Sequence, residues 1–240
     1  RASLLPSVCV VLCGCHGTLP PRSRQLTHDG TARQVAGCTA RPFVHSRTTR
    51  TGRGGLIVAT LVRREDYFDA AIEILSTDDH GGLKQAPLCR HLSVTTGSFY
   101  NYFQSWGQFK TEFLQHWLDQ RTLQLVDAAR LVGASDQRLE LLIEFACALP
   151  HRAESAIRAW AHSDGEVRAV QSVVDEQRFA VVLEATSGLL GPGVDAENFA
   201  RMGLLILYGY QQSMPQPDLE QLRWALKRTF SDALARARWH

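Results

Sequence analysis

Residues 84–103 constrain the fold of this chain more than any other segment, because their pattern predicts two short helices joined by a tight turn. Pro87 lies in the first turn of the first helix, 83–92, where a missing N–H costs little. Thr95 is a favourable N-cap for the second helix, 95–103. That second helix carries small polar residues and two tyrosines. Such pairs are typical of helix-turn-helix units, whose second helix lies in the DNA major groove, so nucleic acid is the first partner to consider.

The side chains of this segment divide into a packing set and a polar set. Val94 is expected to pack the first helix against the second, and Phe99 and Phe103 are expected in the core. Gly97 lets the backbone approach a neighbouring helix or a phosphate closely. The residues that can donate hydrogen bonds to phosphates are Thr95, Thr96, Ser98, Tyr100 and Asn101. Of these, Thr96 and Asn101 could also reach base edges.

The rest of the chain is predicted to be helical from residue 63 onward. Apolar residues recur at helical spacing, and Gly or Pro pairs such as Gly81-Gly82 separate the periodic segments. No strand pattern is found, so the predicted fold class is all-α. Besides the two short helices, helices are expected over 63–76, 106–130, 136–149, 153–162, 165–190, a segment after Asp195, and 218–236.

Residues 1–56 differ in kind from the rest of the chain. Residues 1–64 hold ten arginines and one acid, a balance of +9 in a chain whose total is +2. Residues 1–56 show no sustained helical or strand periodicity and hold four of the six cysteines. One interpretation of the apolar run that ends near Cys13 and Cys15 is a secretory or lipoprotein signal. The spacing of Cys13, Cys15 and His16 does not suit a zinc site. We expect a disordered basic leader or sequence from upstream of the true start, followed by domains at 57–112 and 113–240.

Residues 94–103 read Val-Thr-Thr-Gly-Ser-Phe-Tyr-Asn-Tyr-Phe, which resembles the Val-Ser-x-Gly-x-Leu-Tyr-x-Tyr-Phe pattern of TetR-family transcriptional regulators. The resemblance covers residues 64–117 by motif, and the remainder to residue 236 in helix count and length. It implies an N-terminal helix-turn-helix domain followed by a helical domain for ligand binding and dimerisation. In the family, the tyrosine that matches Tyr100 contacts the DNA backbone, and Tyr102 is a common aromatic position. With the basic residues nearby, the predicted DNA-binding set is Arg63, Arg64, Lys84, Thr95, Thr96, Gly97, Ser98, Tyr100, Asn101, Tyr102 and Lys110.

Two features depart from an ordinary member of that family. Residues 65–112 hold seven acids and three bases, whereas DNA-binding domains usually present a basic face. Trp106 stands where the family often has a lysine that contacts phosphate. An indole can donate one hydrogen bond but supplies no charge, so we expect Lys110 to take over that contact.

The resemblance also implies an effector pocket in the C-terminal domain and a homodimer through the last two helices. The aromatic candidates to line that pocket are Trp117, Phe145, Trp160, Phe179 and Tyr208; the alternative is that they are ordinary core residues. His116, His151 and His162 lack metal-ligand spacing, and Cys147 is expected to be a small core residue. No metal and no cofactor is expected.

The predicted function is a ligand-responsive, homodimeric DNA-binding regulator. It is expected to be a cytoplasmic repressor that a small-molecule effector releases from a palindromic operator, with no membrane partner. The alternative is a helical protein-interaction module whose DNA binding is weakened, which the acidic composition motivates. An enzyme is disfavoured, because the chain contains no Gly-x-Ser-x-Gly, P-loop or His-Glu-x-x-His motif.

Overall fold

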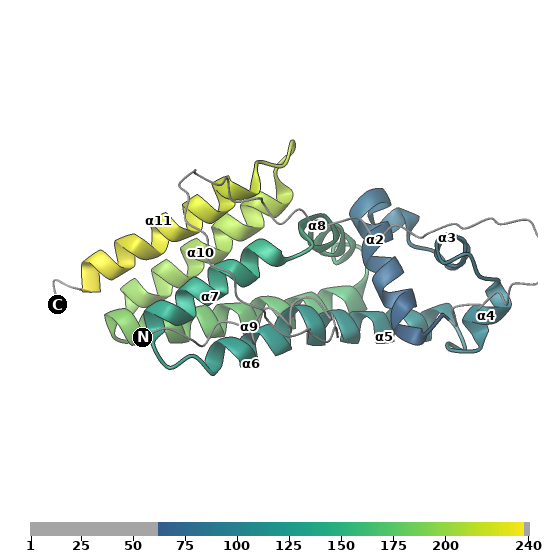
Figure 1. Cartoon of the computed structure of the whole chain (residues 1–240), viewed down its shortest axis with the longest axis horizontal. Helices are drawn as coiled ribbons and strands as arrows, with labels where there is room; N and C mark the ends of the chain where they lie inside the picture. Colours follow the sequence, from purple (N-terminus) through teal and green to yellow (C-terminus); the bar gives the residue numbers. More distant parts are fainter. Residues whose placement is uncertain (1–61, 238–240) are drawn as a thin grey trace, which may run out of the picture. The chain divides into compact units, whose positions relative to one another are not determined.

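The computed structural model describes residues 62–237, all of which belong to one structural unit, and within that range every regular element is a helix. The all-α prediction is therefore confirmed. The leader predicted for residues 1–56 lies outside the described residues. Figure 1 shows the helices, which are α2 (Arg64–Gly82), α3 (Gln85–His91), α4 (Thr96–Tyr100), α5 (Trp106–Leu118), η1 (Asp119–Leu123), α6 (Gln124–Arg130), α7 (Ser135–Ala148), α8 (His151–Trp160), α9 (Gly165–Leu190), α10 (Val194–Gln212) and α11 (Leu219–Ala237).

Helices α2, α3 and α4 form the helix-turn-helix unit that residues 84–103 predict. The Thr95 Oγ1 atom accepts a hydrogen bond from the backbone N–H of Ser98 at 3.2 Å, so Thr95 is the N-cap of α4. At the start of α2, the backbone N–H of Arg63 donates to the Asp66 carboxylate at 2.6 Å. The turn between α3 and α4 contains Ser93, whose φ of 57° lies in the left-handed region.

An aromatic cluster holds this unit together. Phe99 and Phe103 are fully buried against Tyr67 of α2, with edge-on ring contacts at centroid distances of 5.9 and 5.6 Å. Phe109 of α5 lies 5.1 Å from Phe103. Edge-to-face pairs at these distances favour packing beyond the area they bury. Phe99 and Phe103 are four residues apart and both point inward, whereas Tyr100 stays exposed.

The segment predicted as one helix over 106–130 is a continuous helical rod with a π-helical turn in its middle. The turn, η1, lies between α5 and α6. The predicted domain boundary at residues 112 and 113 falls inside α5, so the two predicted domains share one helix. π-Turns within α-helices occur frequently at functional sites.

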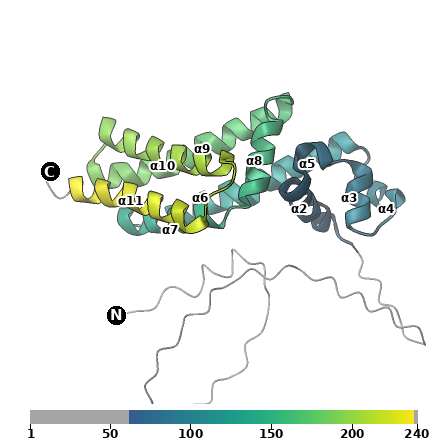
Figure 2. The same ribbon diagram turned by 90° about the horizontal axis from the view of Figure 1, so that it is seen from above.

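The C-terminal helices form a bundle in which α9 runs beside α10 and α7, and α11 packs on α10 and α7. Figure 2 shows α8 between this bundle and the helix-turn-helix unit. Helix α8 makes its most extensive contacts with α2. Gly203 of α10 sits directly under the Phe230 ring of α11, because a Cβ atom there would lie 2.9 Å from that ring. The bundle thus meets the helix-turn-helix unit through α8 and the rod.

Candidate nucleic-acid interface and effector cavity

Helix α4 presents its polar side chains to solvent, while Phe99 on its opposite side enters the core. Tyr100 is 56% exposed. Ser98 is half-buried, and the other residues predicted to contact DNA from this helix and its caps are exposed: Thr95, Thr96, Gly97 and Asn101. A helix with donors on its outer face is suited to contact phosphates and base edges.

Two cations flank this helix without an ion-pair partner among residues 62–237. Lys84 is the N-cap residue of α3, and Arg90 lies in its last turn; both are exposed. Arg63 is also exposed but pairs with Asp66 at 3.3 Å. Arg90 was absent from the predicted DNA-binding set. Its place on the helix that precedes the turn was the signal available in the sequence.

Arg64 and Tyr102, both predicted to contact DNA, bind other parts of the protein. Arg64 donates to the backbone carbonyl of Tyr102 at 2.6 Å, pairs with Glu112 at 3.1 Å, and lies over the Phe103 ring at 5.0 Å. The Tyr102 hydroxyl donates to the carbonyl of Val62 at 2.7 Å. These contacts join the start of α2 to the segment after α4. Their geometry favours a positioning role beside the interface.

Lys110, predicted to replace the missing family lysine, is already neutralised. Its ammonium lies 2.8 Å from both the Asp164 and the Glu166 carboxylates. Hydrogen bonds to these carboxylates raise the pKa of Lys110, and the pKa values of Asp164 and Glu166 are lowered by the same contacts. Since Asp164 also caps α9, Lys110 ties α5 to the start of α9. We therefore leave Lys110 out of the proposed interface.

Trp106, which stands where the family often has a lysine, is a packing residue. Its ring is half-buried and packs on Phe109 at 4.8 Å and Phe99 at 6.2 Å. The position before it, Ser105, caps α5 by accepting from the backbone N–H of Gln108 at 3.1 Å. The side chain at position 106 therefore extends the aromatic core behind α4.

A cavity lies in the C-terminal bundle, between the rod and helices α7, α9 and α10. Its volume is about 70 Å³, or about 440 Å³ when all the empty space at its open mouth is included. Its walls are Arg121, Thr122, Leu125, Val126, Leu142, Phe145, Ala146, Leu149, Arg178, Val181, Leu204 and Leu207. Concave, mostly apolar sites with a few polar groups are typical ligand sites.

The structure places the five aromatic ligand candidates in different surroundings. Phe145 lies in the cavity wall. Trp117 is buried and donates to Glu154, and Trp160 packs near His80 of α2 at a ring distance of 6.4 Å. Phe179 lies beneath the Arg201 guanidinium at 4.6 Å, and Tyr208 belongs to a polar network beside the cavity.

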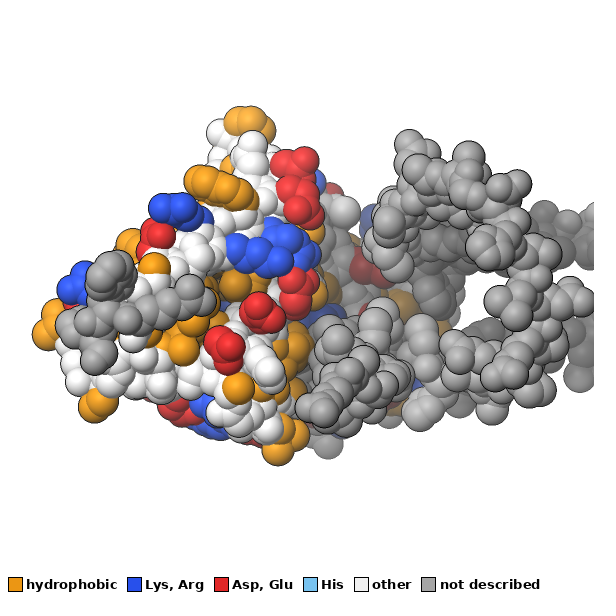
Figure 3. All heavy atoms as spheres, turned by 60° about the vertical axis from the view of Figure 1, so that its left-hand side comes forward, with side chains coloured by type: hydrophobic (Ala, Val, Ile, Leu, Met, Phe, Trp, Pro, Cys, Tyr) orange, Lys and Arg blue, Asp and Glu red, His pale blue; other side chains and the backbone are white. Residues whose placement is uncertain are grey.

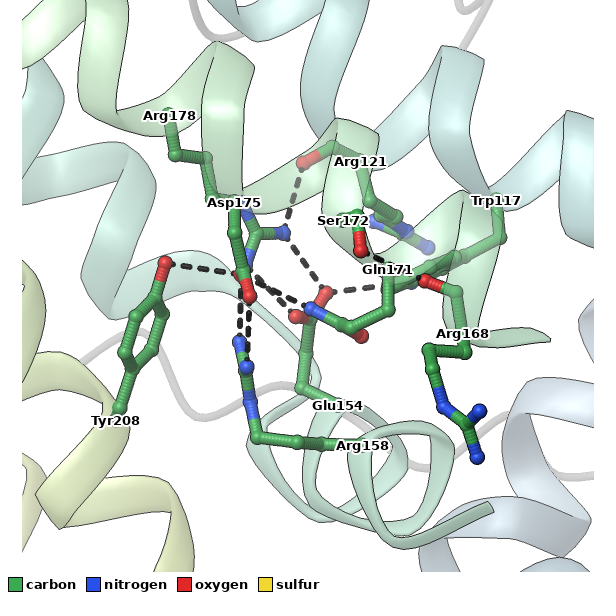
Figure 4. A network of polar contacts seen from close by, with 10 residues as sticks. All are labelled: Trp117, Arg121, Glu154, Arg158, Arg168, Gln171, Ser172, Asp175, Arg178 and Tyr208. Atoms are coloured by element: carbon green, nitrogen blue, oxygen red, sulfur yellow. Dashed lines mark hydrogen bonds and ion pairs between the residues drawn. The ribbon is translucent and has the colours of Figure 1, made fainter. Parts of the chain in front are cut away.

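A buried ion pair connects the cavity wall to α8 (Figure 4). Arg178 of α9 donates to both oxygens of Glu154 at 2.8 and 3.0 Å, and the side chains are 9% and 1% exposed. Trp117 donates to the same carboxylate at 3.2 Å. Arg178 also reaches the carbonyl of Arg121 in the π-turn at 3.3 Å. Burial alone would lower the pKa of Arg178, but Glu154 raises it above its ordinary value, so the guanidinium stays charged.

A second ion pair lies beside the first. Arg158 of α8 makes two hydrogen bonds to Asp175 of α9, at 2.8 and 2.9 Å. The Tyr208 hydroxyl of α10 donates to the same carboxylate at 2.9 Å, and Arg158 stacks over the Tyr208 ring at 4.1 Å. Burial and the Asp175 charge raise the pKa of Tyr208 well above its ordinary value. Helices α8, α9 and α10 are thereby held in one arrangement.

Within residues 62–237, no cluster of three or more His, Cys, Asp or Glu side chains could hold a metal ion. Cys89 and Cys147 are buried free thiols, and burial raises the pKa of both. In the same range, none of the helices combines the length and apolar composition that crossing a bilayer requires.

Comparison with known proteins gives no match to any family model and no match to a curated protein. Solved structures do match. A TetR transcription regulator from Haloarcula marismortui aligns at a TM-score of 0.57 and 19% identity, over 72% of this chain and 96% of its own. A transcriptional regulator from Rhodococcus sp. Rha1 gives 0.59 and 14%, over 72% and 97%.

A third neighbour is a protein from Saccharomonospora viridis that is described as a transcriptional regulator and was solved in complex with choline. It aligns at a TM-score of 0.59 and 11% identity, over 70% of this chain and 95% of its own. These likenesses establish the fold, which is that of TetR-type transcription regulators, as the motif at residues 94–103 predicted. All three neighbours are described as transcription regulators.

Proposed function

We propose that this protein is a DNA-binding transcription regulator whose operator affinity responds to a small-molecule effector. The observation that carries the proposal is helix α4, which presents Thr96, Ser98, Tyr100 and Asn101 outward from a rigid aromatic core. Lys84 and Arg90 supply positive charge beside it. Such a protein acts where the DNA is, in the cytoplasm.

A homodimer would place two copies of α4 on a palindromic operator, since two-fold protein symmetry matches two-fold DNA symmetry. Helix α10 supports this through an exposed stripe of Met202, Leu205 and Gly209, spaced one helical turn apart. Trp224 of α11 is 70% exposed. Figure 3 shows hydrophobic side chains reaching the surface of the bundle among charged ones. The proposed dimer covers this stripe.

The proposed response to effector runs from the cavity to α2. Arg178 lies in the cavity wall and holds Glu154 of α8, and α8 packs on α2. A ligand that fits one arrangement of α8 better than another shifts the population between them. If the favoured arrangement spaces the two α4 helices wrongly for successive major grooves, the dimer leaves its operator. The proposed sign is therefore repression relieved by effector. Ligand binding by the Saccharomonospora viridis neighbour, solved with choline, supports an effector site in this fold.

Fluorescence anisotropy tests the proposal. The full chain is titrated onto labelled duplexes that tile the DNA upstream of its own gene, at several salt concentrations. We expect one duplex containing an inverted repeat to bind far more tightly than a scrambled control, with affinity that falls steeply as salt rises. Equal, weak binding to every duplex would refute it.

The second candidate function is a helical module that works through protein contacts. The observation in its favour is charge: α4 carries no charged side chain, and residues 65–112 hold seven acids and three bases, one of which, Lys110, is paired. The same titration separates the two functions, because a protein-contact module shows no steep salt dependence of DNA affinity.

A further inference from the structure

The rod contains one residue more than an uninterrupted helix would need. Within η1 the backbone N–H of Gln124 donates to the carbonyl of Asp119, five residues earlier. Before the turn the spacing is four, since the N–H of Asp119 donates to the carbonyl of Gln115. After it, the N–H of Leu131 donates to the carbonyl of Asp127 at 3.3 Å, again four residues earlier. A turn closed over five residues takes up one extra residue and lets the helix continue, so the π-turn is a one-residue insertion.

The buried positions of the rod agree with this count. Leu118 and Val126 are both buried and lie eight residues apart, one before the turn and one after it. On an uninterrupted α-helix, eight residues would rotate the second side chain about 80° away from the first, whereas seven would leave only about 20°. With one residue absorbed by the turn, both side chains can face the packed interior.

Glu154 of α8 holds the rod at two places around the insertion (Figure 4). Its carboxylate accepts a hydrogen bond from the Trp117 indole at 3.2 Å, two residues before the turn begins. It also accepts two hydrogen bonds from Arg178 of α9, at 2.8 and 3.0 Å. The same guanidinium donates a further bond to the carbonyl of Arg121, in the middle of the turn, at 3.3 Å. Arg178 therefore joins α8 and α9 to the inserted turn through a single planar group.

The two halves of the rod serve different parts of the molecule. Helix α5 carries Phe109 and Phe113 of the aromatic core behind α4, and α6 carries Val126 of the cavity wall. Sharp changes of direction within helices occur at π-turns far more often than in regular α-helix. We propose that the inserted residue makes the π-turn a joint between these two halves, and that Arg178, held by Glu154, locks the joint. With the lock closed, α5 and the bundle keep one relative orientation.

The lock borders the proposed effector site, and its use in regulation rests on the proposed function. Arg121, Thr122 and Arg178 all line the cavity. An effector that draws Arg178 away from the Arg121 carbonyl would open the joint and release α5, with the helix-turn-helix unit, from its fixed orientation. A dimer whose α4 helices vary in spacing binds successive major grooves less well.

Deletion of Gln120, an exposed residue of the turn, tests the insertion. The shortened rod should form an uninterrupted α-helix, so the variant should keep the circular dichroism of the parent and unfold within about 4 °C of it. The matched control deletes Glu176, an exposed residue of α9, where no π-turn can absorb the change of register. That control should lose cooperative unfolding. If deletion of Gln120 has the same effect, the π-turn is no insertion and the proposal fails.

Hydrogen exchange followed by mass spectrometry tests the lock. Arg178→Lys keeps a positive charge beside Glu154 but lacks the fork of donors that also reaches the Arg121 carbonyl. Amide exchange across residues 120–126 should rise roughly tenfold or more, the effect of losing one hydrogen bond from a charged group, while α11 keeps its rate. The control, Arg130→Lys, alters an exposed arginine of α6 that pairs with α9 and should leave these rates unchanged. No rise in Arg178→Lys, or an equal rise throughout the chain, overturns the lock.

The double variant separates a lock from a purely structural role of Arg178. Deletion of Gln120 removes the joint, so Arg178→Lys in that background should no longer raise exchange across the rod. An equal rise in both backgrounds would mean that Arg178 stabilises the rod without locking a joint, and the proposal would be refuted.

These measurements use neither DNA nor effector, so their outcome is independent of the proposed function. A locked joint in a protein without specific DNA affinity would leave the inference standing and refute the regulator hypothesis. With an operator duplex, Arg178→Lys should bind more weakly than the parent, and deletion of Gln120 should restore the affinity. An unchanged operator affinity in Arg178→Lys would refute the regulatory use of the lock.

Discussion

Ser93 carries conformational strain in the turn of the helix-turn-helix unit. Its φ of 57° is unfavourable for a residue with a side chain, by about 1–2 kcal/mol. Glycine removes that strain but adds about 0.5–1 kcal/mol of unfolded-state entropy. Ser93→Gly should therefore stabilise the protein by roughly 0.5–1 kcal/mol in urea denaturation, on the same strain and entropy arguments. Ser93→Ala, which keeps the strain, serves as the control, and a glycine variant no more stable than it contradicts this account.

The Glu154–Arg178 pair should behave as a buried ion pair. Glu154→Gln leaves a buried guanidinium without its counter-charge, and Arg178→Met leaves a buried carboxylate; each should cost about 3–5 kcal/mol in the free energy of unfolding. The double variant should recover most of that loss, since no unpaired charge remains. Breaking the exposed Arg201–Glu197 pair with Glu197→Gln should cost no more than about 0.5 kcal/mol. Additive losses in the double variant would show that the two residues act separately.

At the scale of elements, α3 rather than α5 should supply the charge that contacts DNA. Arg90→Gln should weaken operator binding and lower the slope of log affinity against log salt by about two, one for each protomer. Arg152→Gln makes the same change of charge at an exposed arginine of α8 that has no ion pair among residues 62–237, and should leave the slope unaltered. The measurement is anisotropy over a range of salt concentrations.

Lys110→Met completes that comparison. Its charge is held by Asp164 and Glu166, so the salt slope should be unchanged while the free energy of unfolding falls. A slope reduced as much as in Arg90→Gln would return Lys110 to the interface.

Helix positions were largely readable from the sequence, because periodicity and breakers are local signals. Residues 165–190 were predicted as one helix and form α9, which ends at Gly191 with a φ of 77°. The π-turn was not predicted, because residues 119–123 contain no Gly or Pro that would mark an irregular turn within the helix. Phe145, predicted to line an effector pocket, lies in the wall of the cavity. The partners of Lys110 lie 54 and 56 residues away in the sequence, at the start of α9. Such long-range pairing has no local signature.

For the whole molecule, α8 and the rod are the two links between the cavity and the helix-turn-helix unit. Helix α8 contacts α2 on one side and holds α9 through two ion pairs on the other. The rod carries the π-turn at the cavity and the aromatic core at its start. An effector bound in the cavity, as proposed, would therefore lie beside both links. On the regulator hypothesis, these two links are the route by which the cavity would bias the position of α4.

Dimerisation through α10 and α11 is the property of the whole molecule that the regulator hypothesis most requires. Leu205 is 68% exposed at the centre of the α10 stripe, so Leu205→Glu should place a charge in the proposed interface and produce a monomer. The monomer should keep its helical content but lose at least tenfold in operator affinity, because one copy of α4 lacks the effective concentration of a linked pair.

Leu131→Glu is the matched control, since Leu131 is 89% exposed after α6 and lies off the stripe. It should remain dimeric and bind DNA as the parent does. Sedimentation velocity and anisotropy, run on the same samples, check both variants. A Leu205→Glu protein that sediments as a dimer would mean that the two copies meet through another face, and the spacing of the α4 helices would then have to be argued from that interface.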